Sequence, residues 1–129
     1  MSPARSPNEP AALTPLSFQI LLALAGGALH GYGILKDIEE RSGVGTVPST
    51  GALYLALQRL EEEGLIEEAA ARSAGEDSRR RYYALTEAGR SVAMAETARL
   101  AKLVGAAHER RLIATRQLAK LVPGGGHGS

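Results

Sequence analysis

The chain has 129 residues, of which 44% are hydrophobic, and this is enough for one domain with a single core and an appendage. It contains no cysteine, which excludes disulfides, thiolate metal sites and thiol nucleophiles. The 15 basic and 14 acidic residues nearly cancel, so their distribution along the chain is more informative than the net charge of +1.

The two ends of the chain have the composition of disordered segments. Residues 1–13 contain three prolines and few large apolar residues, and residues 123–129, "PGGGHGS", are rich in glycine and lack a core residue. The first segment has no apolar run of signal-peptide length, and no stretch of about 18 apolar residues occurs elsewhere. We therefore expect a cytoplasmic protein that does not span a membrane.

Two short helices are predicted after the N-terminal segment. In "TPLSFQILLALAGGAL", Thr14 can cap the first helix, Pro15 suits its first position, and two glycines end it. The apolar face of this helix comprises Leu16, Ile20, Ala23 and Leu24. The second helix follows "HGYG" and stops near Ser42, with a core-facing side made of Ile34, Leu35 and Ile38. Gly31 and Gly33 are expected to let these two helices approach closely.

The segment "PSTGALYLALQRLEEEGLI" predicts a third helix. Ser49 or Thr50 can accept a hydrogen bond from the first turn, and Gly64 is placed to end the helix. One buried stripe is expected to contain Leu53, Leu57 and Leu60. The runs "LIEEAAA" and "RRYYAL", separated by the polar "RSAGEDSR", then predict an antiparallel hairpin, after which Thr86 can cap a further helix.

Residues 86–122 are compatible with a helix almost throughout, and a helix of that length would extend roughly 55 Å, farther than the small head can cover. Apolar residues recur there at spacings of four and three, which resembles a heptad seam, and a seam needs a partner. Gly105 lies inside this segment and could mark a bend. We therefore predict a dimer formed through Leu100, Leu103, Val104, Ala107, Ile113, Leu118 and Leu121.

These elements together predict a mainly α-helical protein with a small β-hairpin. Three short helices followed by a hairpin describe a winged helix-turn-helix, whose third helix enters the DNA major groove while the hairpin touches the backbone. We place this head at residues 14–85 and a long C-terminal dimerisation helix at residues 86–122. A disordered arm at residues 1–13 and a disordered tail at residues 123–129 complete the expected organisation.

Three motifs give the sequence a specific family resemblance. They are "HGY" at the start of the second helix, "GALYLALQRLEEEGLI" in the third, and "RRYYALTEAG" leaving the hairpin. Over roughly residues 16 to 90 the chain resembles the DNA-binding domain of PadR-like transcriptional regulators, and its single C-terminal helical segment resembles the short subgroup, whose members are dimers. The resemblance implies a homodimeric repressor of its own or neighbouring genes, often relieved by a small molecule, here expected to be apolar or aromatic.

The residues predicted to contact double-stranded DNA lie at the front of the second and third helices and in the hairpin. Small residues, hydroxyls and exposed amides suit the front of a recognition helix, and arginines in a hairpin can lie along phosphates or enter the minor groove. The candidates are His30, Tyr32, Lys36, Ser49, Thr50, Gly51, Tyr54, Arg59, Arg79, Arg80 and Arg81.

Each of these assignments has a structural alternative. Helix capping alone would explain the hydroxyls of Ser49 and Thr50, and His30 would be structural at the start of a helix. Core packing would explain the two tyrosines, and pairing with the glutamates that follow would explain Arg59. The hairpin tip would then be a solvated loop.

Other classes of function fit the sequence less well. The three histidines are far apart and lack metal-ligand spacing, and no nucleophile is placed beside a base, so we predict no catalysis, no metal and no cofactor. The alternative that remains is a winged-helix module that binds a protein rather than DNA, since the fold serves both purposes. The arginines of the hairpin favour DNA.

Overall fold

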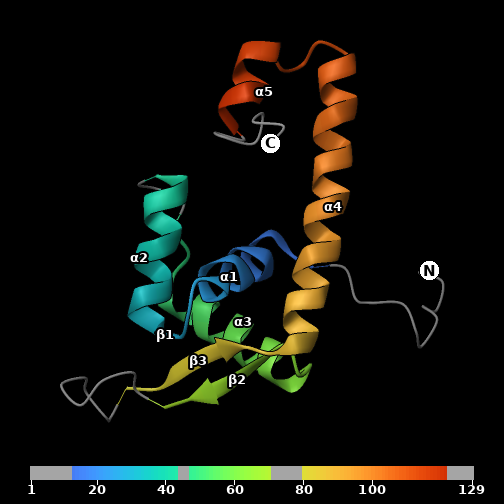
Figure 1. The fold of residues 1–129 in the computed structure, drawn as a ribbon. Coiled ribbons are helices and arrows are strands. Elements are labelled where there is room, and N and C mark those ends of the chain that lie inside the picture. Colours follow the sequence, from blue (N-terminus) through green and yellow to red (C-terminus); the bar gives the residue numbers. More distant parts are fainter. Residues whose placement is uncertain (1–12, 44–46, 71–79, 122–129) are drawn as a thin grey trace, which may run out of the picture. The chain divides into compact units, whose positions relative to one another are not determined.

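The computed structural model describes residues 13–43, 47–70 and 80–121 (Figure 1). The chain divides into two compact units, Met1–Met94 and Ala95–Ser129. Almost all of the predicted arm and tail, together with Arg79 at the hairpin tip, lie outside the described residues. The described elements are, in chain order, α1 (Pro15–Ala25), β1 (Leu29–His30), α2 (Gly31–Ser42), α3 (Thr50–Glu62), β2 (Ile66–Ala69), β3 (Tyr82–Leu85), α4 (Glu87–Glu109) and α5 (Thr115–Leu121).

Local signals set the ends of the first three helices. The Thr14 hydroxyl accepts a hydrogen bond from the backbone N–H of Ser17 at 3.0 Å, as the predicted cap of α1 requires. The apolar stripes of α1, α2 and α3 meet in one core, and burying aliphatic side chains of this size is the main stabilising contribution to such a unit. Its fully buried members on these helices are Ile20, Leu21, Ile34, Ile38, Leu53, Leu57 and Leu60.

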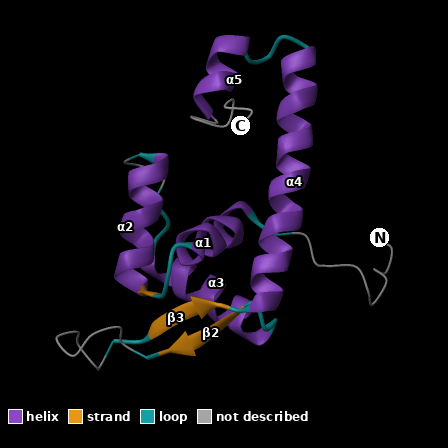
Figure 2. Cartoon of the chain, in the orientation of Figure 1, coloured by secondary structure: helices purple, strands orange, loops and turns teal. Residues whose placement is uncertain are grey.

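The predicted hairpin is present, but it belongs to a three-stranded antiparallel sheet in the order β1-β3-β2. Figure 2 shows β2 and β3 side by side, in a register that pairs Ile66 with Leu85 and Ala69 with Tyr82. The short strand β1 was not predicted, because two residues cannot display the alternation that identifies a strand. It places His30 opposite Tyr82 on the central strand.

The start of α4 is fixed to the turn that follows α3. Thr86 donates its backbone N–H to the carbonyl of Leu65 at 3.1 Å and its hydroxyl to the carbonyl of Gly64 at 2.7 Å. The same hydroxyl accepts from the N–H of Gly89 at 2.9 Å, which confirms Thr86 as the cap. Gly89 is buried against this turn, and a Cβ there would overlap the carbonyl oxygen of Leu65. The close approach therefore requires glycine.

The expectation of one continuous helix over residues 86–122 is wrong. Helix α4 continues through Gly105 and ends at Glu109. Just beyond this end, Arg111 adopts a left-handed conformation with φ of 62°. The N–H of Arg111 bonds to the carbonyl of His108 at 3.0 Å, and the N–H of Leu112 bonds to that of Ala107 at 2.8 Å. This is a Schellman ending, usually made by glycine, so an arginine gives no warning of it in the sequence.

A second helix then begins under local control. The side-chain oxygen of Gln117 accepts from the N–H of Ala114 at 3.0 Å, half of the reciprocal arrangement known as a capping box. Helix α5 has no buried residue among those described, and Gly89 is the one buried residue described in α4. The predicted dimer residues are accordingly half-buried or exposed within the chain: Leu100, Val104, Ala107, Ile113 and Leu118 are half-buried, and Leu103 and Leu121 are exposed.

Candidate nucleic-acid interface

The front of α3 separates two hydroxyls that the sequence could not distinguish. Ser49 is the N-cap, and its Oγ accepts from the N–H of Ala52 at 3.1 Å. The capping explanation is therefore correct for Ser49. Thr50 and Gly51 follow as the first two residues of α3, and both are exposed. A Cβ added at Gly51 would meet nothing within 4 Å, so packing does not demand its small size.

The start of α2 gives His30 a structural role. It is the N-cap, and its Nδ1 accepts from the backbone N–H of Gly33 at 3.0 Å. The imidazole lies 6.3 Å from the ring of Tyr32 and 5.1 Å from the ring of Tyr82, measured between centroids. The other ring nitrogen, Nε2, lies 2.8 Å from Nη1 of Arg80. The strand pairing of β1 with β3 thus brings the start of α2 next to the base of the hairpin.

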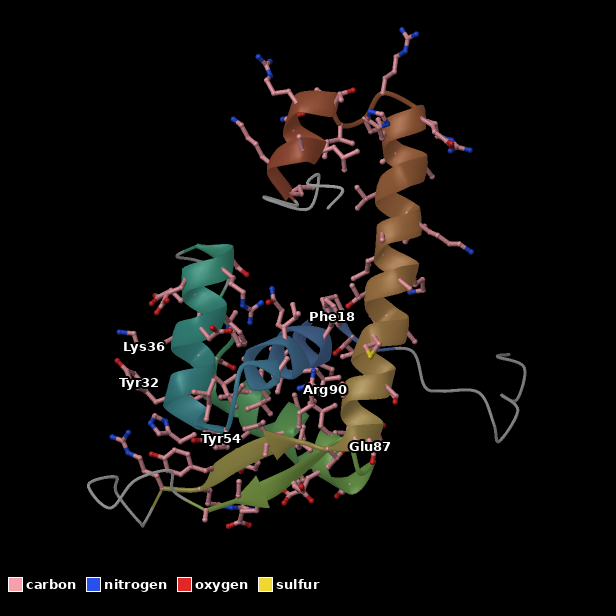
Figure 3. The ribbon with its side chains drawn as sticks, viewed as in Figure 1. Phe18, Tyr32, Lys36, Tyr54, Glu87 and Arg90 are labelled. Carbon is pink, nitrogen blue, oxygen red and sulfur yellow. The ribbon has the colours of Figure 1, made fainter. Side chains whose placement is uncertain are left out.

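Two tyrosines for which core packing was the alternative are exposed instead. Tyr32 is 61% exposed and Tyr54 is 48% exposed, so the core explanation is wrong for both. Tyr32 and Lys36 project from the same side of α2, away from α1 (Figure 3), with the Lys36 Nζ 5.8 Å from the centre of the Tyr32 ring. A Cβ at Gly31 would overlap the Tyr54 hydroxyl. Gly31 therefore makes room for a side chain of α3.

The arginines near the hairpin have different surroundings. Nη2 of Arg81 lies 3.0 Å from a carboxylate oxygen of Glu68 and 3.6 Å from one of Glu61. Its guanidinium also lies 5.5 Å from the centre of the Tyr83 ring. The hydrogen bond to Glu68, followed by the charges of Tyr83, Glu68 and Glu61, raises the pKa of Arg81, while burial raises the pKa of Tyr83. Two carboxylates thus partly balance the charge of Arg81.

Residues from three parts of the head converge on one open pocket of about 430 Å³. Its described lining consists of His30, Gly31, Tyr32, Tyr54, Arg80 and Arg81. We call the exposed face that includes this pocket, Lys36 and the front of α3 the α2–α3 surface. It unites most of the predicted contact residues, which lie up to 51 positions apart in the sequence. Arg59 is also exposed, farther along α3.

Sequence reasoning missed Leu55 on the outer side of α3. This leucine is 56% exposed, unlike the three leucines of the buried stripe in the same helix. Gly51, Leu55 and Arg59 succeed one another at intervals of four residues and therefore follow one side of the helix. A leucine outside the stripe at positions 53, 57 and 60 was the signal that could have identified it.

The described residues contain no group of three or more His, Cys, Asp or Glu side chains that could hold a metal ion. None of the described helices is both long enough and apolar enough to cross a membrane. The α2–α3 surface offers cationic groups, aromatic rings and hydroxyls, which are suited to binding a polar and negatively charged partner.

Three solved structures of transcriptional regulators have a similar fold. A PadR family transcription regulator from hypervirulent Clostridium difficile is 26% identical, with a TM-score of 0.64 over 73% of this chain and 95% of that one. A transcriptional regulator from Clostridium thermocellum is 28% identical, with a TM-score of 0.62 over 73% and 87% of the two chains. Bacillus subtilis PadR, solved in complex with operator DNA, is 25% identical, with a TM-score of 0.54 over 64% of this chain and 46% of that one.

Sequence comparison agrees with the structural likeness. The chain is 42% identical over 90 residues to a 37.1 kDa protein encoded in a transposon of Streptomyces fradiae. The aligned residues cover 70% of this chain. The match spans only 24% of that longer relative. Residues 20–95 match the transcriptional regulator PadR-like family. The matched region includes α2, α3, the whole sheet and the start of α4. The chain therefore belongs to the PadR-like family of transcriptional regulators.

Proposed function

We propose that this protein is a homodimeric, sequence-specific repressor that binds an inverted-repeat operator through the α2–α3 surface. The observation that carries the proposal is the exposure of the front of α3 beside the cationic and aromatic groups of the pocket. Family membership supports a role in transcription, and a similar regulator, Bacillus subtilis PadR, has been solved with operator DNA. The protein would act in the cytoplasm by binding, without catalysis.

In this proposal the two kinds of DNA contact come from different elements. The outer side of α3 would lie in the major groove, where Thr50 and Gly51 allow close approach and Leu55 and Arg59 meet base edges. The DNA backbone would be contacted from the start of α2, from Tyr54 of α3 and from the hairpin, where charge matters more than sequence. The proposed backbone contacts are His30, Tyr32, Lys36, Tyr54, Arg79 and Arg80. Ser49 and Arg81 would support the surface, one as a cap and one through its carboxylate partners.

The operator is the first thing to identify. Selection of bound fragments from the source genome should return sequences with two inverted half-sites about 34 to 36 Å apart along one face of the duplex, because a two-fold dimer presents two equivalent α3 helices. Selection that enriches no fragment, together with a protein partner whose capture is insensitive to salt, would favour the protein-binding alternative.

Dimerisation would cover the apolar side chains that one chain leaves exposed. Leu103 is 54% exposed on α4, and Leu112 and Leu121 are 78% and 62% exposed near and on α5. Because the helix is interrupted at residues 110–114, the heptad-like seam cannot continue as one coiled coil, and we propose two separate contact segments. The α4 segment contains Leu100, Leu103, Val104 and Ala107, and the second segment contains Ile113, Leu118 and Leu121.

Leu103→Glu should convert the dimer to a monomer. The side chain is exposed within one chain, so glutamate is tolerated there, but in the dimer it would bury a charge without a partner. Sedimentation equilibrium should show the mass of one chain instead of two. Lys102→Glu, an exposed neighbour on the same helix, is the matched control and should remain dimeric. If the Leu103→Glu protein still has the mass of a dimer, the α4 segment is not part of the dimer interface.

The regulatory part of the proposal is release from DNA by a small apolar or aromatic effector. Such an effector would bind the DNA-free form more tightly than the DNA-bound form, because only a difference in affinity can shift the equilibrium. Adding it should then weaken operator binding in a titration without unfolding the protein.

A further inference from the structure

The imidazole of His30 lies between two hydrogen-bond donors. Its Nδ1 accepts from the backbone N–H of Gly33, a group fixed by the first turn of α2. A neutral imidazole has one N–H and one acceptor nitrogen, so this contact assigns the ring proton to Nε2. His30 therefore presents an N–H, and not a lone pair, on the side that faces the pocket.

The partner of that N–H is also a donor. Nη1 of Arg80 lies 2.8 Å from Nε2, and a guanidinium has no acceptor atom. The contacts of His30 with Gly33 and with Arg80 cannot both be hydrogen bonds of one neutral ring. Since Arg80 is exposed while the Gly33 N–H is part of a helix, the contact with Arg80 is the one left without an acceptor. An acceptor placed beside the two groups, within hydrogen-bond distance of each, would satisfy both.

We propose that His30 and Arg80 together bind one phosphate group of the DNA backbone. A phosphate oxygen only accepts, and it can take a hydrogen bond from Nε2–H and another from the guanidinium, whose charge strengthens the contact. The pocket beside them is open and, among its described lining residues, contains no carboxylate. This inference rests on the proposed function, because it identifies which side chains hold the backbone.

The imidazole is held in place before DNA arrives. The N–H of Gly33 fixes one edge of the ring, Tyr82 packs against it edge-on at 74°, and Tyr32 lies beside it at 23°. A donor held in this way loses little conformational freedom when it binds. The pairing of His30 with Tyr82 between β1 and β3 also keeps the base of the hairpin, and with it Arg80, at the same point.

Two substitutions test the site without removing the cap. His30→Asn keeps an oxygen that can accept from Gly33 and is a good N-cap, but it lacks a donor that reaches the pocket. Arg80→Gln removes the charge and retains most of the side chain. Each should weaken binding to the selected operator duplex by about 10-fold for each half-site, the size expected for one hydrogen bond to a charged group. The affinity loss of the double variant should be smaller than the product of the two single losses. Binding of phosphate relieves the donor–donor contact, and either substitution alone already removes that gain.

Salt dependence distinguishes the two residues. Arg80→Gln should reduce the slope of log affinity against log salt by about 0.9 for each site, while His30→Asn should leave it unchanged, because a neutral imidazole neutralises no phosphate. Arg116→Gln, which removes the same charge from exposed α5, is the matched control and should leave the affinity and the slope as they are. Calorimetric melting of each variant checks that the head remains folded.

The outcomes separate this site from the wider proposal. If the wild-type protein binds its operator and His30→Asn binds equally well, the phosphate site is excluded and the proposed function stands. If the affinity loss of the double variant equals the product of the two single losses, the residues act independently and the shared site is excluded. An operator with a neutral methylphosphonate at the contacted phosphate offers a test with the unaltered chain, which should bind it about 10-fold more weakly at the least. If the wild-type protein binds no duplex, both proposals fail.

Discussion

Gly89→Ala is expected to lower the free energy of unfolding by at least about 3 kcal/mol, at the upper end of the cost of overpacking. The added Cβ would overlap the backbone carbonyl oxygen of Leu65, which already accepts the N–H of Thr86. A flexible side chain could move aside, but this backbone is held by the turn between α3 and β2 and by the cap of α4. Denaturant unfolding followed by circular dichroism would measure the loss.

Gly51→Ala is the matched control for this substitution. Nothing lies within 4 Å of the added Cβ, and Gly51 occupies an exposed position in the first turn of α3. Alanine has the higher helix propensity, so this variant should be more stable than the wild type by up to about 1 kcal/mol. If Gly89→Ala unfolds at the same denaturant concentration as the wild type, α4 does not approach the backbone of Leu65 closely at this position.

Thr50→Glu should weaken operator binding by about 100-fold or more and leave the protein folded. The side chain is exposed on the first turn of α3 and is not the cap, so a longer and charged residue there meets the DNA first and is repelled by its phosphates. Stability should remain within about 0.5 kcal/mol, because an exposed acidic residue is favourable near a helix N-terminus. DNA titration and calorimetric melting of one preparation measure both effects.

Thr115→Glu gives the corresponding change outside the α2–α3 surface. Thr115 is likewise the first residue of its helix, α5, and is exposed. Its substitution adds the same charge to the protein, so a loss of DNA binding shared by both variants would reflect net charge alone. Full affinity in a folded Thr50→Glu protein would exclude the front of α3 from the DNA interface and bring the protein-binding alternative forward.

The sequence by itself determined the elements whose signals are local. Thr14 and Thr86 accept the hydrogen bonds that make them caps, and the leucines at positions 53, 57 and 60 are buried as their spacing predicts. These features depend on the helix repeat and on backbone N–H groups a few residues away, so they can be read along the chain. The same motifs identified the family, which the match over residues 20–95 confirms.

The tertiary structure alone decided which distant groups meet. The contact between His30 and Arg80 joins residues 50 positions apart and depends on a strand of two residues that has no pattern of its own. Exposure of Tyr32 and Tyr54 could not be read from residue type, because a tyrosine is equally suited to a core and to a wet surface. The end of α4 is set by local hydrogen bonds, but it needs Arg111 in a left-handed conformation that residue type disfavours, so the sequence did not reveal it. Contacts such as that between His30 and Arg80 depend on how whole elements pack, and a periodic pattern along one element does not reveal which elements lie next to it.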